Sequence, residues 1–372
     1  MAPVGDYAYV DREAGTAVMY APGKILVIGG GGPATAATPT GVTNTVERID
    51  LNAGTTAQFQ YDAPMQFARF HVNGTILPDG TVLVTGGIPN IGKNDLDAIL
   101  PAELWTPPAS GSGPGTWTTL NPMSEPRLYH STAVLLPDGR VLSAGGGGGA
   151  EYTDHPTAEI FSPPYLFKGA RPRISGAPTH VGYGQAFTVV ATPGSGTVAR
   201  VTLVRLSSVT HSFNMNQRFL ELPITTNTVA GGTASVAVAA PGSNNDCPPG
   251  HYLLFVLNSN GVPSEGQVVQ VDGNPCSSLA VGIANAPTGD CATLATATAT
   301  GPNLGTDFKW TINGVYEADY DGFSSVTLEI NPCQPQVTFG VRVTPSCGGS
   351  PVENFASAGR YFVPNKCPCI NP

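Results

Sequence analysis

Three stretches of the chain repeat one pattern, an apolar strand that ends in a pair of glycines. They are Lys24-Ile-Leu-Val-Ile-Gly-Gly30, Thr81-Val-Leu-Val-Thr-Gly-Gly87 and Arg140-Val-Leu-Ser-Ala-Gly-Gly146, and their glycine pairs lie 57 and 59 residues apart. The same turn, Leu-Pro-Asp-Gly, precedes the second and third copies at 77–80 and 136–139. A unit that recurs at such a period predicts small sheets that bury their cores only by packing against one another.

A further segment follows each copy. These segments are Ala102-Glu-Leu-Trp-Thr106, Ala158-Glu-Ile-Phe-Ser162 and the fainter Val46-Glu-Arg-Ile-Asp50. The period and the glycine pair are typical of kelch-type β-propeller blades. Residues 1–170 supply about three blades, whereas propellers close with ~4–8, so we expect an incomplete ring. Open sheet edges are hazardous, which favours a chain that is part of a longer protein over half-rings that pair between chains.

Composition predicts an all-β protein. The 372 residues include 46 Gly and 35 Pro, and charged residues make up 12%, about half the usual ~25%. Surface helices need Glu, Lys and Arg, whereas short strands joined by Gly/Pro turns fit these numbers. Short alternating strands over 171–272 predict an immunoglobulin-like β-sandwich, and residues 273–372 predict a second β-sandwich whose role stays open.

Six of the seven cysteines lie in the last of these three domains. They are Cys276, Cys291, Cys333, Cys347, Cys367 and Cys369. An even, dense set predicts disulfides and an extracellular or cell-surface location, although the first residues do not resemble a signal peptide. The pairing of the six stays open, and Cys247 is either free or paired with the tail.

Charge excludes some partners. The 17 basic and 26 acidic residues give a net charge of −9, and no Lys/Arg cluster could neutralise a run of phosphates, so we expect no nucleic acid partner. No apolar run approaches the ~20 residues that a membrane span needs. The short charged run Asp11-Arg12-Glu13 is expected to be solvated.

Three residues stand out as candidate metal ligands. Tyr129 and His130 lie close to the start of a predicted strand, and His211 lies in the predicted sandwich. Adjacent side chains on a regular strand point to opposite faces, so Tyr129 and His130 reach one centre only if the backbone bends there. Two imidazoles and a phenol oxygen suit copper(II) better than zinc or magnesium. The alternative is packing, because Phe70-His71 aligns with Tyr129-His130 in the repeat.

The glycine run at 145–149 follows a strand and opens no helix, so it does not predict a phosphate site. We expect it to serve a tight turn where larger side chains would clash.

Motifs spread over residues 13–272 carry a family resemblance. They are Gly15-Thr-Ala-Val-Met-Tyr20, Phe67-Ala-Arg69 with His71, Arg127-Leu-Tyr-His-Ser131, Leu135-Leu-Pro-Asp-Gly-Arg-Val141, Ala158-Glu-Ile-Phe-Ser-Pro-Pro-Tyr-Leu166, Thr210-His-Ser-Phe-Asn-Met-Asn-Gln-Arg218, Pro249-Gly-His-Tyr-Leu-Leu-Phe-Val256 and Asn258-Ser-Asn-Gly-Val-Pro-Ser264. In this order they resemble the C-terminal part of galactose oxidase and its relatives, the glyoxal oxidases. The tail beyond residue 273 lies outside the resemblance.

The resemblance implies a secreted copper-radical oxidase. In that family a kelch propeller holds one copper ion on its axis, and a hairpin from the following domain supplies a histidine. Carried over, His130 and His211 would be copper ligands, and Tyr129 would be the axial ligand and the base that accepts the substrate hydroxyl proton. The implied reaction oxidises a primary alcohol or an aldehyde with O2 to give H2O2, so the expected partners are a small alcohol or aldehyde and O2.

The family's radical site has no counterpart in this chain. There a second tyrosine, thioether-bonded to a cysteine, carries the radical, whereas the first cysteine here is Cys247, in the sandwich. We therefore expect the chain to be the C-terminal portion of a longer oxidase and to be inactive in isolation. Two alternatives stay open: a non-catalytic extracellular protein that binds glycans or wall polymers, through its tail for example, and an adhesive or structural surface module.

Overall fold

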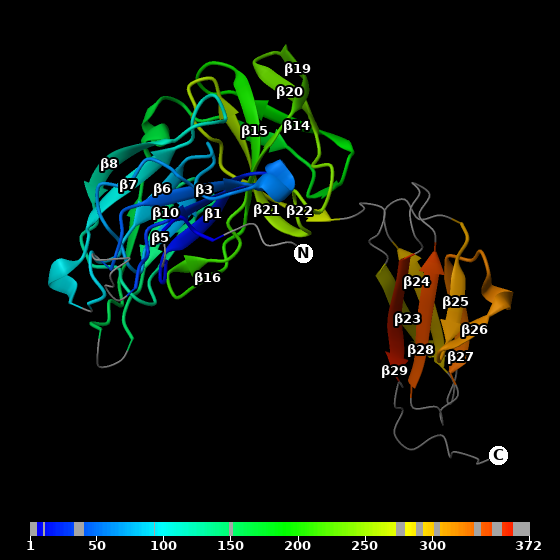
Figure 1. Ribbon diagram of the computed structural model, residues 1–372. Helices are drawn as coiled ribbons and strands as arrows, with labels where there is room; N and C mark the ends of the chain where they lie inside the picture. The colour runs from blue at the N-terminus through cyan, green and yellow to red at the C-terminus, as the bar shows by residue number, and fades with distance from the viewer. Residues whose placement is uncertain are drawn as a thin grey trace. The chain divides into compact units, whose positions relative to one another are not determined.

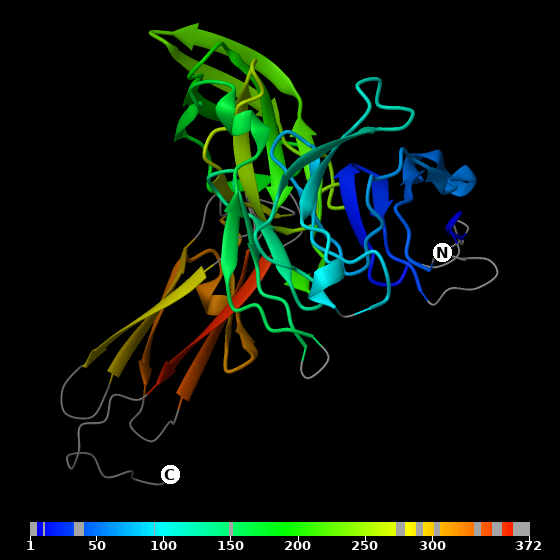
Figure 2. The same cartoon turned by 90° about the vertical axis from the view of Figure 1, so that its left-hand side faces the viewer.

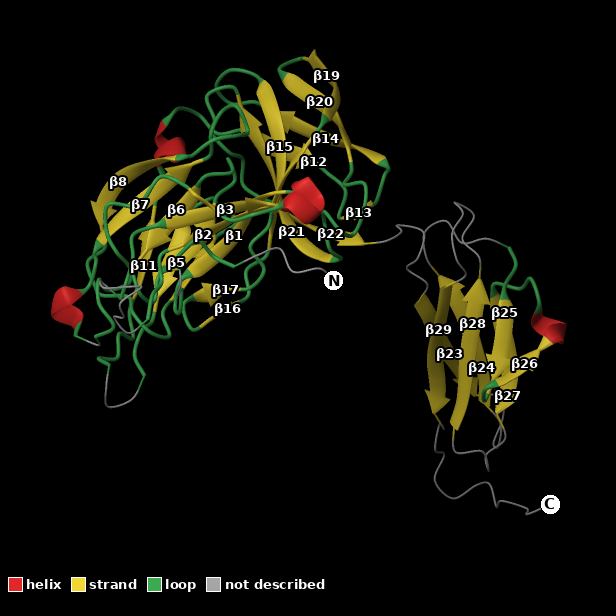
Figure 3. Ribbon diagram, in the orientation of Figure 1, coloured by secondary structure: helices red, strands yellow, loops and turns green. Residues whose placement is uncertain are grey.

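The structure is a computed structural model that describes residues 6–9, 12–32, 41–92, 94–148, 152–272, 280–287, 293–300, 306–330, 336–343 and 352–359. It divides into two compact units, Met1–Val271 and Asp272–Pro372, each considered by itself. The all-β prediction is confirmed, since the described residues form strands and a few short 3-10 helices (Figures 1 and 3). The helices are η1 (Leu51–Thr56), η2 (Asp95–Asp97), η4 (Pro164–Phe167) and η5 (Ala318–Tyr320). Among these residues no helix has the length and apolarity of a membrane span.

Each repeat of the sequence forms one antiparallel sheet (Figure 2). The strand that ends in the glycine pair is the second of its sheet. The first sheet is β1 (Thr16–Ala21), β2 (Lys24–Ile28), β3 (Val46–Asp50) and β4 (Gln60–Tyr61). The second is β5 (Asn73–Ile76), β6 (Val82–Thr85), β7 (Pro101–Thr106) and β8 (Thr116–Pro122), and the third is β9 (Thr132–Leu135), β10 (Val141–Ala144) and β11 (Ala158–Phe161). The first strands contact one another in succession, β1 against β5 and β5 against β9. One core runs through all three sheets, with Trp105 fully buried in it.

A buried arginine pairs with a glutamate in each repeat. The pairs are Arg12–Glu47, Arg69–Glu103 and Arg127–Glu159, with nitrogen–oxygen distances of 2.5, 2.9 and 3.6 Å. Each guanidinium also donates to the carbonyl oxygen of the first glycine of its repeat, Gly29, Gly86 and Gly145. The prediction that Arg12 is solvated is wrong: its side chain is 2% exposed, because Glu47 compensates its charge inside the protein.

The glycine pairs allow one sheet to approach the next. A Cβ on Gly86 would lie 2.3 Å from the carbonyl oxygen of Arg127, and φ at Gly86 is 69°. The amide of Gly87 donates to that same carbonyl at 2.9 Å. A side chain at position 86 would therefore push the second and third sheets apart, so the close approach requires glycine.

The last hundred residues of the first unit form two facing sheets. One has the order β12-β14-β20-β19 and the other β13-β22-β21-β15-β18. Their strands are β12 (Arg173–Gly176), β13 (His180–Gly182), β14 (Ala186–Thr192), β15 (Val198–Arg205), β18 (Phe219–Leu222), β19 (Ile224–Ala230), β20 (Thr233–Ala239), β21 (Gly250–Asn258) and β22 (Gln267–Asp272). Inward side chains of both sheets, such as Val189 and Leu254, share one core. The domain boundary expected near residue 170 falls inside this compact unit.

Cys247 is a free thiol buried in the core of these two sheets. Burial raises the pKa of this thiol, so it stays protonated and inert at neutral pH.

The second unit also has two sheets. One contains β23 (Ala280–Pro287), β24 (Thr293–Thr300) and β27 (Ser325–Ile330), and the other β25 (Lys309–Ile312), β26 (Val315–Glu317), β28 (Gln336–Val343) and β29 (Val352–Gly359). Ala297 of the first sheet and Trp310 and Phe339 of the second share a buried core. The six tail cysteines lie outside the described residues, so their disulfides stay a prediction.

Candidate functional site

Two of the candidate ligands lie in the loop that leads into β9. His130 has φ 61°, in the left-handed region, and the chain therefore bends two residues before the strand begins at Thr132. The bend brings adjacent side chains to one side, because the rings of Tyr129 and His130 are stacked with centroids 3.9 Å apart and planes 27° apart. A common centre for these two side chains requires such a bend, and the backbone has one at His130.

His211 lies at the tip of a hairpin formed by β16 (Val209–Thr210) and β17 (Phe213–Asn214). His211 and Ser212 are the two central residues, with φ of 53° and 63°. Positive φ at both positions is typical of a type I′ turn, whose twist matches the two strands it joins. The hairpin extends from the sandwich to the first strands of all three sheets, with β17 against β1 and β5 and β16 against β9 (Figure 1).

Buried hydrogen bonds hold the hairpin tip against the loop of Tyr129. The Ser212 hydroxyl donates to the carbonyl oxygen of Leu128 at 2.9 Å and lies 3.2 Å from the hydroxyl of Ser131. Asn73, at the start of β5, donates to the Ser131 hydroxyl at 2.8 Å. Ser212, Ser131 and Asn73 are all buried, so this network links the hairpin to two sheets in a water-poor environment.

The three candidate ligands thereby meet. The ring centroid of His211 lies 4.8 Å from that of His130 and 5.6 Å from that of Tyr129. The Thr210 hydroxyl lies 2.6 Å from His211 Nδ1. This contact fixes the orientation of the ring and leaves Nε2 as the nitrogen that can bind a metal. His130 and His211 are exposed and Tyr129 is half-buried, so a ligand can reach all three.

The donors fit copper(II). Within the described residues no three His, Cys, Asp or Glu side chains gather as a metal site. The candidate set instead combines two imidazoles with the phenol oxygen of Tyr129. Such a mixed nitrogen and oxygen set suits the tetragonal geometry of copper(II).

Two further aromatic residues surround Tyr129. The ring centroids of His71 and Tyr152 lie 5.1 and 5.3 Å from that of Tyr129, and His71 Nε2 lies 3.1 Å from the Tyr152 hydroxyl. His71 has φ 61° and stands two residues before β5, as His130 stands two residues before β9. The repeat itself therefore places an imidazole here, which explains the alignment of the two histidines in the sequence.

No pattern in the sequence indicated that Tyr152 lies at this site, except for the glycine run that precedes it. A Cβ on Gly148 would lie 2.9 Å from Cδ1 of Tyr129 and 3.3 Å from Cδ2 of Tyr152. The run thus lets the backbone pass beside both rings, as expected of a turn where larger side chains would clash. Burial, and to a lesser extent a Coulombic interaction with Tyr129, raise the pKa of Tyr152, so Tyr152 stays a neutral phenol at neutral pH.

The loop that carries Tyr152 is anchored by His155. One ring nitrogen of His155 lies 3.1 Å from an Asp95 carboxylate oxygen and the other 3.3 Å from Glu125. A hydrogen bond from the Thr157 hydroxyl is the main reason that the pKa of Glu125 is lowered, with His155 contributing. These contacts link the loop to η2 and to the segment before Tyr129.

Comparison with known proteins identifies relatives of the first unit. Residues 171–271 match the family model of the galactose oxidase-like early set domain. A galactose oxidase of Gibberella zeae is 32% identical over 271 residues, which is 70% of this chain and 38% of that protein. An aldehyde oxidase of Arabidopsis thaliana is 36% identical over 225 residues, or 56% of this chain and 36% of that protein. The chain thus spans less than half the length of these curated relatives.

A solved structure agrees with this relationship. A fungal alcohol oxidase of the AA5 family, in complex with copper, superposes with a TM-score of 0.62 at 31% sequence identity. The match covers 73% of this chain and 56% of the oxidase. Together these findings confirm the resemblance that the sequence motifs carried.

Proposed function

We propose, from the premise that this chain is homologous to galactose oxidase and the aldehyde oxidases, that it carries the copper-binding part of an alcohol or aldehyde oxidase. The observation that carries the proposal is the meeting of Tyr129, His130 and His211, which come from a sheet loop and from a separate hairpin. Packing alone does not require two exposed imidazoles and a phenol to converge at the end of a hairpin.

In this proposal His130, His211 and Tyr129 would hold copper(II). Bound copper(II) supplies a one-electron acceptor beside the substrate. The Tyr129 oxygen accepts the proton of the substrate hydroxyl, because a phenolate near a metal ion is available as a base. The hydroxyl of Thr210 holds His211 in the orientation that presents Nε2.

The substrate class is a small primary alcohol or aldehyde, oxidised with O2 to give H2O2. The radical-bearing tyrosine and cysteine of the related oxidases have no counterpart here, and the sole cysteine described, Cys247, is buried in the sandwich core. We therefore propose that the 372-residue chain binds copper and that efficient oxidation needs the missing radical partner.

The three sheets of residues 16–161 serve as kelch blades around the axis on which copper binds, since their first strands contact one another and the hairpin. The protein works outside the cell, the cysteines of the tail form disulfides, and the tail binds glycans.

Copper binding tests the proposal directly. The metal-free chain should take up one copper(II) ion, measured by elemental analysis after dialysis. His211→Ala removes a proposed ligand, so its copper affinity should fall by more than the ~10–100-fold that is typical when only the hydrogen-bond partner of a ligand is removed. His251→Ala is the matched control, because this exposed histidine lies on β21 of the sandwich. Equal copper affinity in His211→Ala and the unchanged chain would refute the assignment.

A further inference from the structure

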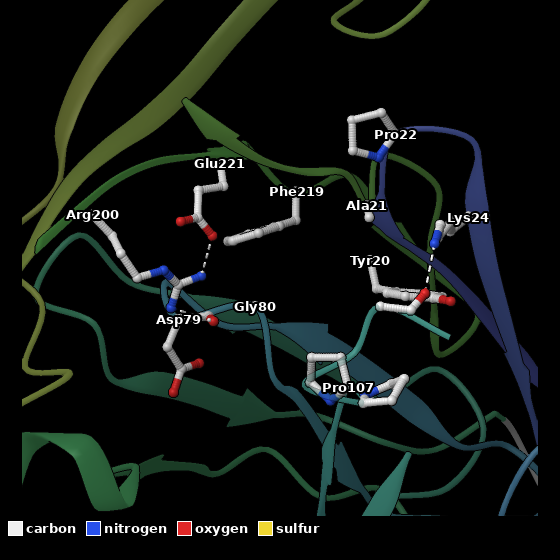
Figure 4. A pocket seen from close by; sticks show the side chains of 12 residues that line it. Tyr20, Ala21, Pro22, Lys24, Asp79, Gly80, Pro107, Arg200, Phe219 and Glu221 are labelled. Atoms are coloured by element: carbon white, nitrogen blue, oxygen red, sulfur yellow. Dashed lines mark hydrogen bonds and ion pairs between the residues drawn. The ribbon is translucent and has the colours of Figure 1, made fainter. Parts of the chain in front are cut away.

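A cavity of about 260 Å³ lies in the first unit at a distance from the candidate copper site (Figure 4). Strand β5 begins two residues after His71, and the turn that follows its other end, at Asp79 and Gly80, lines the cavity. The cavity therefore lies at the opposite end of β5 from the copper site. Its other walls come from the turn after β1, the loop after β7 and the sandwich strands β15 and β18.

The apolar part of the wall is closely packed. Tyr20 packs edge-on against Trp105 with ring centroids 4.9 Å apart, and burial raises the pKa of Tyr20, so its phenol stays neutral. Phe219 is 5% exposed, and a Cβ on Gly80 would lie 3.1 Å from its ring, so the aromatic edge is closely packed. Pro107 lies opposite Phe219 across the opening (Figure 4).

The charged groups of the wall are already compensated. Arg200 donates to Glu221 Oε2 at 2.7 Å and to the carbonyl oxygen of Asp79 at 3.0 Å. Lys24 donates to the carbonyl oxygen of Gly111 at 2.8 Å. Lys24 also lies 3.6 Å from an Asp50 carboxylate oxygen, and the Asp79 carboxylate accepts from the amide and hydroxyl of Thr81. With two cations and two carboxylates in its wall, the cavity offers no net charge to hold an ion. A carboxylate, a guanidinium and an ammonium group nevertheless have hydrogen-bonding capacity beyond these contacts, which suits neutral hydroxyl groups.

We propose that this cavity binds one neutral pyranose ring of a glycan. The C–H face of such a ring packs on the aromatic and proline wall, and its hydroxyls bond to Glu221, Arg200 and Lys24. The volume is just below the ~300–1,000 Å³ of sites for drug-sized ligands, so it fits a single ring. The site is independent of the proposed copper chemistry and would hold the protein on a glycan while leaving the copper site open.

The full, metal-free chain should be tested by saturation-transfer NMR with methyl β-D-glucopyranoside and methyl β-D-galactopyranoside. At least one glycoside should bind with millimolar affinity, and Glu221→Gln and Lys24→Met should each weaken it at least about tenfold, because a hydrogen bond to a charged group is lost. Both side chains are partly exposed, so the variants should fold, and Glu265→Gln, at an exposed residue outside the cavity, should bind as the unchanged chain does.

Several results would overturn this inference. Saturation transfer to neither glycoside would do so, as would unchanged affinity in Glu221→Gln and Lys24→Met. Displacement of the glycoside by inorganic phosphate would show an anion site, and equal binding of cyclohexylmethanol would show an apolar pocket with no preference for sugars. Because copper is absent throughout, failure here leaves the copper-binding test unaffected.

Discussion

Arg69 carries its charge with none of its side chain exposed to solvent. Burial lowers the pKa of this guanidinium, and the interaction with Glu103 raises it again. The charge of Arg69 inside the protein is therefore stabilised by Glu103. Removing one partner leaves a buried charge uncompensated. We expect Arg69→Met to lower the free energy of unfolding by about 3–5 kcal/mol, measured by urea denaturation followed through tryptophan fluorescence.

The matched control is Arg140→Met. Arg140 pairs with Asp138, but both side chains are well exposed, at 42% and 32%. Exposed pairs contribute ~0–1 kcal/mol, so this variant should unfold almost as the unchanged chain does. Equal losses in the two variants would mean that burial does not set the importance of the repeated ion pair.

At the scale of elements, the glycine pairs set the distance between sheets. Gly86 and Gly111 have nearly the same φ, 69° and 70°, but a Cβ on Gly111 would meet nothing within 4 Å. Gly111→Ala should therefore lower the free energy of unfolding only by the strain of a left-handed alanine, about 1–2 kcal/mol. Gly86→Ala adds the collision with the carbonyl of Arg127 and should cost clearly more in the same urea experiment. Equal costs would rule out close packing of the second and third sheets as the reason for glycine.

At the scale of the whole molecule, carboxylates in the third repeat make stability depend on pH. Burial alone would raise the pKa of Glu159, but hydrogen bonds from the amides of Ser124 and Glu125, with Arg127 nearby, lower it overall. A carboxylate whose pKa is lowered by folding stabilises the protein above the unfolded value of ~4.3, and this stabilisation is lost as pH falls through the folded value.

We therefore expect the free energy of unfolding to fall as the pH drops below about 4.3. Glu159→Gln should be less stable than the unchanged chain at pH 7 and should show a weaker pH dependence between pH 5 and 3. Glu265→Gln, at an exposed residue, should follow the unchanged chain at every pH. A Glu159→Gln curve parallel to that of the unchanged chain would contradict this role.

Local patterns were readable from the sequence, and long-range partners were not. The glycine-pair repeat predicted three small sheets, and the adjacency of Tyr129 and His130 showed that a common centre would require a bend, which lies at His130. Periodicity gives no information about which side chain lies opposite another, so it missed that Glu47 pairs with Arg12, 35 residues before it. Tyr152 was missed for the same reason, since its place beside Tyr129 depends on the path of a loop.

The candidate ligands come from two pieces of the fold, the loop before β9 and the hairpin of β16 and β17. An ion held by both can bind only while the hairpin is docked, so its binding free energy adds to the docking free energy. At a free ion concentration 100-fold above Kd, this addition is about 2.7 kcal/mol. Such an ion is a removable cross-link, and slower amide hydrogen exchange over residues 209–214 would report that it is in place.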